Sequence, residues 1–208
     1  MSIEQLESIA QAMVAPGKGI IAIDESNNTI KKRFDAVGVP NTEENRRAYR
    51  EMLLTTPGLN QHISGAILYD ETIRQKAKDG TPLVDIMKAA GSIPGIKVDT
   101  GAKSLAGPTA AIETVTEGLD GLRERLAEYH RLGARFAKWR GVITIGEGCP
   151  TWNCVKANAH GLARYAALCQ EAGIVPIVET EVLMEGAHSK HDINECIRVT
   201  EWTLSTVF

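Results

Sequence analysis

The sequence of 208 residues has no excess of basic residues, few aromatic residues and no long apolar run. Its formal net charge is −3, and aromatic residues make up 5% of the chain. Without a basic excess, there is no general reason to expect nucleic acid or an anionic membrane as a partner, so any anion site must be local. No apolar run approaches the ~18 residues that a membrane helix needs. We therefore expect neither kind of partner.

Cysteine is also scarce, and its spacing matches no zinc framework. The four cysteines are Cys149, Cys154, Cys169 and Cys196. A chain of this length needs no disulfide staples, so we expect reduced thiols. His188 and His191 lie near Cys196, but they are typical of a solvent-facing loop and helix start, and we expect no metal. Met1 is followed by SIEQLES rather than by a basic and then apolar segment, which predicts no secretory signal and a cytoplasmic protein.

What the sequence does contain is a regular alternation of β-branched runs with helical patterns. The β-branched runs predict strands at 17–24, 64–71, 95–101, 134–146 and 173–181. Apolar residues at helical spacing predict helices at 2–15, 42–54, 82–91, 120–134, 152–172 and from about 189 or 192 to 208. The stretch 101–119, rich in glycine, is expected to be a functional loop. Five strand–helix units imply a parallel sheet, either doubly wound or a (β/α) barrel.

Charged side chains gather where these predicted strands end. They are Asp24 on the first strand, Lys97 and Asp99 on the third, Lys138 and Arg140 on the fourth, and Glu179 and Glu181 on the fifth. Residues two apart on a strand share a face, and active sites of parallel α/β proteins lie at the carboxyl ends of the strands. Structural salt bridges would explain one such pair. A set spread over four strands favours an active site, because perturbed ionisable groups concentrate there.

These groups suit carbonyl chemistry on a phosphorylated sugar. Lysine and arginine can hold phosphate oxygens and developing alkoxides. A carboxylate beside a lysine can move protons, and a desolvated lysine near other cations can attack a carbonyl to form a Schiff base. The G-x-G at Gly17 and Gly19 precedes a strand instead of following one, so it is not a dinucleotide fingerprint. We expect no cofactor.

The segments IIAIDES, TEENRRAYREMLLTT, GIKVDTG, GARFAKWR and GIVPIVETE, in this order, closely resemble class I fructose-bisphosphate aldolase. The resemblance runs from about residue 2 to residue 208. It implies a (β/α)8 TIM barrel, of which 1–208 would hold about the first five βα units as a single, incomplete domain. It also implies a lyase of glycolysis and gluconeogenesis. Such an enzyme cleaves fructose 1,6-bisphosphate reversibly into dihydroxyacetone phosphate and glyceraldehyde 3-phosphate, through a lysine Schiff base and without metal. A cytoplasmic homotetramer would follow from the same resemblance.

The resemblance assigns catalytic roles to four residues. Asp24 would be the acid/base group at the substrate hydroxyl where the carbon–carbon bond breaks. Lys138 would stabilise the charge that develops near that hydroxyl. Glu179 would shuttle protons while the carbinolamine forms and dehydrates, and Glu181 would lie beside the imine lysine. The resemblance also implies that the substrate phosphates are bound by Ser26, Arg33 and Lys97. It implies that Arg140 holds the site carboxylates in place.

The sequence departs from the family pattern in four places, one of which is Thr29, where the family more often has serine. The family's KVDKG is KVDTG here, and its VEPE is VETE, where Thr180 should point to the other face from the glutamates. The family's Schiff-base lysine lies on a sixth strand, in an LLKPN segment that these 208 residues do not contain. We therefore expect a truncated chain that is inactive alone, or one half of a split enzyme. Two alternatives stay open: a non-catalytic scaffold that binds sugar phosphate or a protein, and another barrel aldolase with its Schiff base on Lys138 or Lys97.

Overall fold

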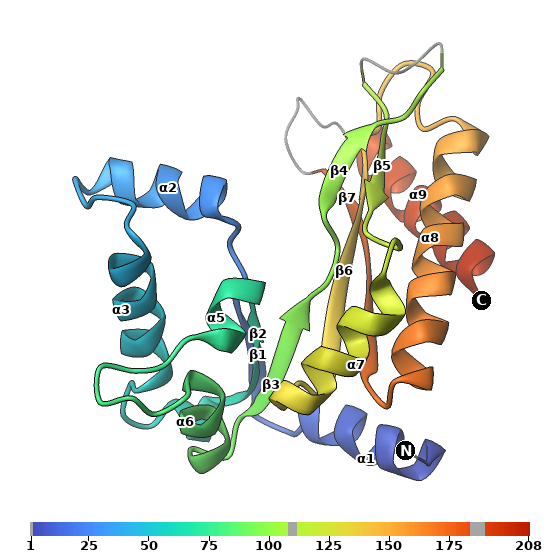
Figure 1. Ribbon diagram of the computed structural model, residues 1–208. Coiled ribbons are helices and arrows are strands. Elements are labelled where there is room, and N and C mark those ends of the chain that lie inside the picture. Colours follow the sequence, from blue (N-terminus) through green and yellow to red (C-terminus); the bar gives the residue numbers. More distant parts are fainter. Residues whose placement is uncertain (1, 108–111, 184–189) are drawn as a thin grey trace.

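The computed structural model describes residues 2–107, 112–183 and 190–208, the first three residues of the last range by their backbone alone (Figure 1). Five parallel strands form one curled, open sheet in the order β1-β2-β3-β6-β7. Their bounds are Gly19–Ile23 (β1), Ile63–Leu68 (β2), Ile93–Lys97 (β3), Phe136–Ile143 (β6) and Val175–Val182 (β7). The predicted parallel sheet of five βα units is confirmed, and it forms part of a barrel.

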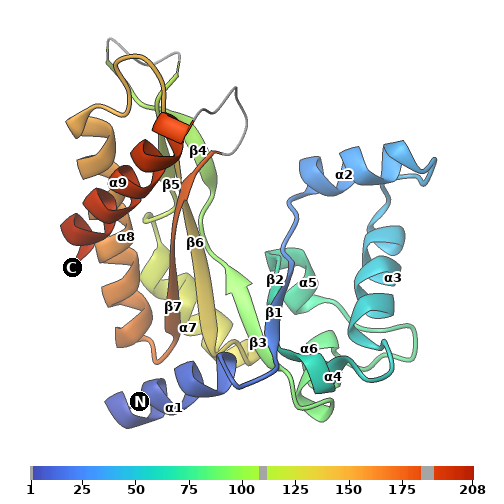
Figure 2. The same ribbon diagram turned by 180° about the vertical axis from the view of Figure 1, so that it is seen from behind.

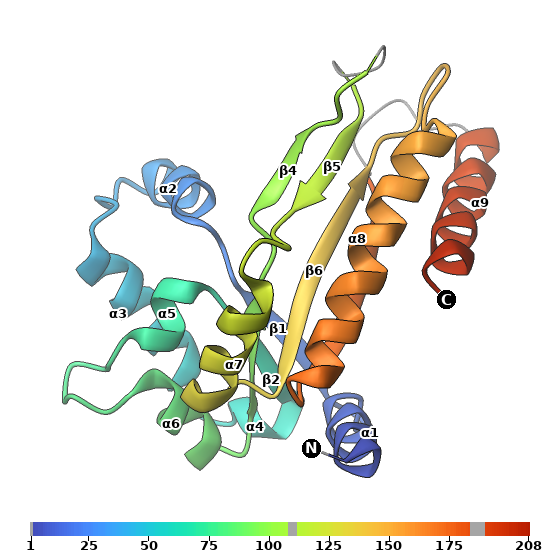
Figure 3. The same ribbon diagram turned by 45° about the vertical axis from the view of Figure 1, so that its right-hand side comes forward.

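Helices connect the strands, and most of them lie along one side of the sheet, while the first helix lies across the amino ends of the strands (Figures 1, 2 and 3). They are α1 (Ile3–Met13), α2 (Asn27–Ala36), α3 (Glu43–Leu54), α4 (Leu59–His62), α5 (Asp70–Arg74), α6 (Leu83–Ala89), α7 (Leu122–Leu132), α8 (Trp152–Glu171) and α9 (Lys190–Val207). The predicted helices are confirmed, including the Ser2–Gln5 capping box of α1 and the left-handed Gly133 that ends α7. Three helices were not predicted, namely α2, α4 and α5. The last two are too short for periodicity to reveal.

The outer face of the sheet packs against the helices and forms the main core. Ile96 and Trp139 from the strands and Leu126 and Tyr165 from α7 and α8 are at most 1% exposed. The rings of Trp139 and Tyr165 lie 5.5 Å apart between centroids. These side chains belong to one continuous apolar cluster, which fixes the strands beneath the helices.

The inner face is apolar only at the amino ends of the strands. There Phe136 is fully buried and packs with Met13 and Ile67. Its ring occupies space that glycines leave open on the neighbouring strands. A Cβ added at Gly95 would lie 2.2 Å from the ring, and one added at Gly65 would lie 2.9 Å from it. One ring therefore plugs this end of the partial barrel.

The prediction of a loop over 101–119 was wrong in part. It holds an antiparallel hairpin of β4 (Gly101–Ser104) and β5 (Thr114–Glu117), and 108–111 lie outside the described residues. The strands are short, and the surrounding glycines hid the alternation in TVTE. The hairpin is tied to its surroundings. Asn158 Oδ1 accepts from Thr116 N at 3.1 Å, Asn158 Nδ2 donates to Thr114 O at 2.9 Å, and Thr116 Oγ1 donates to Arg140 O at 2.8 Å.

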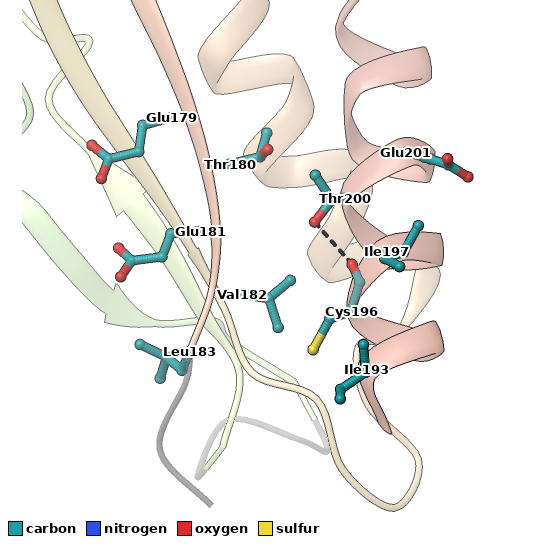
Figure 4. A pocket seen from close by; sticks show the side chains of 10 residues that line it. All are labelled: Glu179, Thr180, Glu181, Val182, Leu183, Ile193, Cys196, Ile197, Thr200 and Glu201. Atoms are coloured by element: carbon teal, nitrogen blue, oxygen red, sulfur yellow. Dashed lines mark hydrogen bonds between the residues drawn. The ribbon is translucent and has the colours of Figure 1, made fainter. Parts of the chain in front are cut away.

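Within the described residues, β1 and β7 each pair with one strand only. Along β7 lies a cavity of about 660 Å³ between the strand and α9. Val182 faces it from β7, and Ile193 and Ile197 face it from α9 at 56% and 53% exposure (Figure 4). Exposed apolar side chains therefore line the groove beside β7.

None of the described helices is both long and apolar enough to cross a bilayer. The predicted helix start at Ser189 and the residue His188 lie outside the described residues, and so does the side chain of His191.

Candidate active site

The carboxyl ends of the strands surround a cavity of about 580 Å³. Parallel strands carry their carboxyl ends to one edge, so residues far apart in sequence meet there. Six of the eight predicted site residues line this cavity, namely Asp24, Ser26, Arg33, Lys97, Lys138 and Arg140. The other two, Glu179 and Glu181, do not line it and reach it through their ion-pair partners.

Lys138 of β6 joins three strands of the sheet. Its Nζ lies 3.2 Å from Asp24 Oδ2, just beyond β1, and 3.1 Å from Glu179 Oε2 on β7. The Lys138 and Asp24 side chains are each only 12% exposed. Burial alone would lower the pKa of Lys138, but the two carboxylates outweigh it and raise this pKa above its ordinary value. Lys138 is thus held as a cation, which disfavours the alternative that it attacks a carbonyl as a neutral amine.

Lys97 lies at the end of β3 and is bound by Asp99. Its Nζ donates to Asp99 Oδ1 at 2.7 Å and to the Asp99 carbonyl at 2.9 Å. The Asp99 carboxylate also accepts from Gly101 N at 3.1 Å and from Arg140 N at 3.4 Å. Asp99 therefore fixes the lysine, the start of the hairpin and the neighbouring strand together.

Glu179 and Glu181 point to one side of β7, while Thr180 and Val182 point toward α9 (Figure 4). This is the arrangement that the period of a strand predicts. Glu181 forms an ion pair with Arg140 of β6. Arg140 is thus paired with a carboxylate, as the resemblance implies, and it remains 40% exposed at the cavity.

Ser26 and Arg33 line the cavity from the α2 side. Ser26 is the N-cap residue of α2, but its hydroxyl caps no backbone group and instead lies 3.2 Å from Thr29 Oγ1. Arg33 is 58% exposed and forms an ion pair with Glu25. Both side chains belong to α2 or its cap, a helix that the sequence did not predict. This helix is what brings them to the strand ends.

Two arginines were missed by the sequence interpretation. Arg125 of α7 lines the cavity, and it donates to Val98 O at 2.9 Å and to Gly118 O. Arg50 of α3 is fully buried and donates to carbonyls on both sides of Asp24. A signal for Arg50 was present, because Arg46, Arg50 and Leu54 follow one another at helical spacing on a single buried stripe.

The described residues contain no group of three or more His, Cys, Asp or Glu placed to hold a metal ion. All four cysteines are free. Burial raises the pKa of Cys154 to about 11 and that of Cys169 to about 12, so these thiols stay protonated at neutral pH.

The fold is a partial (β/α) barrel, with paired lysines and carboxylates at the strand ends, where active sites of barrel enzymes lie. The sequence matches the family model for class-I fructose-bisphosphate aldolase over residues 5–208. The chain belongs to this family.

The relatives that match this chain are longer than the chain itself. It is 67% identical over 208 residues to "Probable fructose-bisphosphate aldolase class 1" of Xanthomonas axonopodis pv. citri, covering 100% of the chain and 61% of that protein. It is 54% identical to "Fructose-bisphosphate aldolase 1" of Toxoplasma gondii, with 99% and 56% covered. The crystal structure of Plasmodium falciparum fructose-bisphosphate aldolase superposes with a TM-score of 0.93 at 50% identity, covering 99% of this chain and 58% of that one. The chain therefore spans less than two thirds of the length of these relatives.

Proposed function

We propose that this chain supplies the strand-end groups of an enzyme that cleaves fructose 1,6-bisphosphate reversibly into dihydroxyacetone phosphate and glyceraldehyde 3-phosphate. The observation that carries the proposal is the Lys138 ammonium, held between Asp24 at 3.2 Å and Glu179 at 3.1 Å. A cation between two carboxylates at the strand ends suits a reaction in which a hydroxyl loses its proton and an alkoxide must be stabilised.

The family resemblance suggests the following steps. A lysine amine adds to the substrate ketone, and the carbinolamine loses water to give an iminium ion, with Glu179 transferring the protons. Asp24 then takes the proton of the substrate hydroxyl as the adjacent carbon–carbon bond breaks. The electron pair of that bond moves into the iminium, which becomes an enamine. Lys138 stabilises the oxygen that becomes the aldehyde. By the resemblance, the amine belongs to a sixth-strand lysine in a segment beyond these 208 residues, and Glu181 lies beside it.

Lys97, Ser26 and Arg33 are proposed to bind the substrate phosphates, since all three line the same cavity. Arg140 would keep Glu181 in place through their ion pair. Relatives named as cytosolic aldolases from Arabidopsis thaliana support a cytoplasmic location for this protein as well. A homotetramer is proposed from the family resemblance alone.

A chimera tests the proposal. Residues 1–208 of this chain would be joined to the remaining part of the Xanthomonas relative, to which it is 67% identical. The chimera should cleave fructose 1,6-bisphosphate, and borohydride with dihydroxyacetone phosphate should add mass to it but not to the 208-residue chain. Trapping at Lys138 or Lys97 of the short chain would instead support a different Schiff-base aldolase. Binding without any trapping would support a non-catalytic scaffold.

The same chimera tests the catalytic role of Asp24 by itself. Asp24→Asn should lower kcat by about 10²–10⁴-fold, the usual contribution of a positioned acid or base. The matched control is Asp35→Asn, because Asp35 pairs with Lys31 on the surface of α2 and is 55% exposed. Wild-type turnover in the Asp24→Asn chimera would contradict the proposed role.

A further inference from the structure

Arg50 of α3 points its guanidinium at the end of β1, and none of its surface is exposed (0%). Its Nε donates to Ile23 O at 3.3 Å, and its Nη2 donates to Glu25 O at 2.7 Å. These two carbonyls flank Asp24 in the sequence. One rigid, planar group thus bridges the backbone across Asp24.

Glu25 provides a second link to the same segment. Its carboxylate is 5% exposed and lies 3.6 Å from Arg50 Nη2, and it also forms an ion pair with Arg33 of α2. Glu71 Oε1 lies 3.8 Å from Arg50 Nη1. The residue that follows Asp24 is therefore held by its carbonyl and by its side chain.

The hydrogen bonds between strands do not fix the backbone at Asp24. Within the described residues β1 pairs with β2 alone, and the last registered pair is Ile23 with Leu68. Asp24 comes one residue later. Yet its carboxylate must meet Lys138, which stands on β6, on the far side of β2 and β3 in the sheet. A small rotation of the backbone at Asp24 would separate the two groups.

The burial of Arg50 also calls for an explanation. Taking a guanidinium out of water costs several kcal/mol unless its hydrogen bonds are replaced. Burial lowers the pKa of Arg50, and Glu25 and Glu71 oppose this change. Leu54, one turn further along α3, fills the same buried stripe with an apolar side chain. Packing alone therefore does not require a charge at position 50, whereas a guanidinium there donates to both carbonyls.

We infer that Arg50 is a positioning residue, which fixes the backbone around Asp24 and so holds the Asp24 carboxylate beside Lys138. The inference rests on the proposed function only for what Asp24 does to a substrate. The positioning itself involves residues of this chain and can be measured without turnover.

The test is the titration of Lys138 in the 208-residue chain, followed by NMR with isotope-labelled lysine and assigned with a Lys138→Arg variant. Asp24→Asn removes one of the two carboxylates beside Lys138. The fall in the Lys138 midpoint in this variant is the largest that loss of the Asp24 contact can cause. Arg50→Lys keeps the charge, but an ammonium cannot span both carbonyls as the planar fork does. We expect Arg50→Lys to lower the midpoint by at least half of that fall. Arg50→Met should do the same if it folds.

Arg46→Lys is the matched control. Arg46 lies on the same buried stripe and bonds Glu71 and Asn41, and its hydrogen bonds include neither carbonyl beside Asp24. It should leave the Lys138 midpoint unchanged. A folded Arg50→Lys variant with a wild-type midpoint would overturn the inference, and so would an equal fall in Arg46→Lys.

The chimera separates this inference from the proposed function. There Arg50→Lys should lower kcat tenfold or more and leave KM within twofold, because a displaced acid/base group affects the reaction more than the binding. If Asp24→Asn keeps full turnover while Arg50→Lys shifts the Lys138 midpoint, the proposed function fails and the positioning stands. Unchanged kcat in Arg50→Lys, with Asp24→Asn inactive, would count against the positioning.

Discussion

The outer face of the five-stranded sheet and its inner face alternate along the same strands, yet they are covered in different ways. On β6, Trp139 points outward under the helices at 1% exposure, while Lys138 points inward beside two carboxylates. The outer face is mostly apolar, with Thr180 of β7 as a polar residue on the α9 side. The inner face is apolar around Phe136 and charged at the carboxyl ends of the strands. We therefore expect the outer face to supply most of the stability and the charged end of the inner face to supply the chemistry.

The largest loss of stability should come from the outer face. Trp139→Ala removes a buried ring that packs on Tyr165 and should lower the free energy of unfolding by about 3–5 kcal/mol. Urea denaturation measures the change. The control Trp152→Ala removes an indole that is 48% exposed, and its effect should be much smaller. Equal losses from the two substitutions would break the comparison.

A smaller loss of stability is expected from overpacking the space around the Phe136 ring on the inner face. Gly95→Ala places a Cβ 2.2 Å from the Phe136 ring and should destabilise by about 1–3 kcal/mol. Gly19→Ala meets nothing within 4 Å and should stay within about 0.5 kcal/mol of wild type. Phe136→Leu, combined with Gly95→Ala, should recover part of the loss in the same denaturation assay. Additive losses in the double variant would argue against the steric explanation.

The contribution of the charged end of the inner face to stability should change at alkaline pH. Because the folded pKa of Lys138 is raised, its stabilising contribution is complete below the ordinary value of 10.5 and is lost as pH rises through the folded pKa. The difference in unfolding free energy between wild type and Lys138→Met should thus be constant at neutral pH and shrink above pH 10.5. Chemical denaturation at several pH values checks this. A difference that does not depend on pH would mean that the ion pairs contribute nothing.

The helical layer should give the smallest effect, at acid pH. Burial, and then the nearby Arg135, lower the pKa of His130 of α7. The folded state therefore prefers the neutral ring, and its contribution is present above the ordinary value of 6.5 and is lost as pH falls through the folded pKa. His130→Gln should flatten the stability profile just below pH 6.5. Thermal unfolding between neutral and mildly acid pH measures it, and an unchanged slope would contradict the assignment.

Sequence reasoning recovered the sheet because each strand is a β-branched run and each long helix has a clear apolar stripe. It also placed Asp24 and Lys138 at one edge, since parallel strands end together. It could not show that Lys138 lies between Asp24 and Glu179, because that depends on strand order and curvature. Arg50 and Arg125 were missed for the same reason: their hydrogen-bond partners include backbone carbonyls at the carboxyl ends of β1 and β3, far away in the sequence. The roles assigned to the site residues stay predictions.

Asn158 has a consequence for how the hairpin behaves toward other chains. Its side-chain amide bonds both Thr114 O and Thr116 N, as a peptide group of a neighbouring strand would. The free edge of β5 is therefore already satisfied at these two positions by a helix. Exposed edges invite pairing with strands of other molecules, and this one is blocked by a single amide. α8 thus protects the β5 edge of the hairpin against pairing with other strands, as well as supporting it.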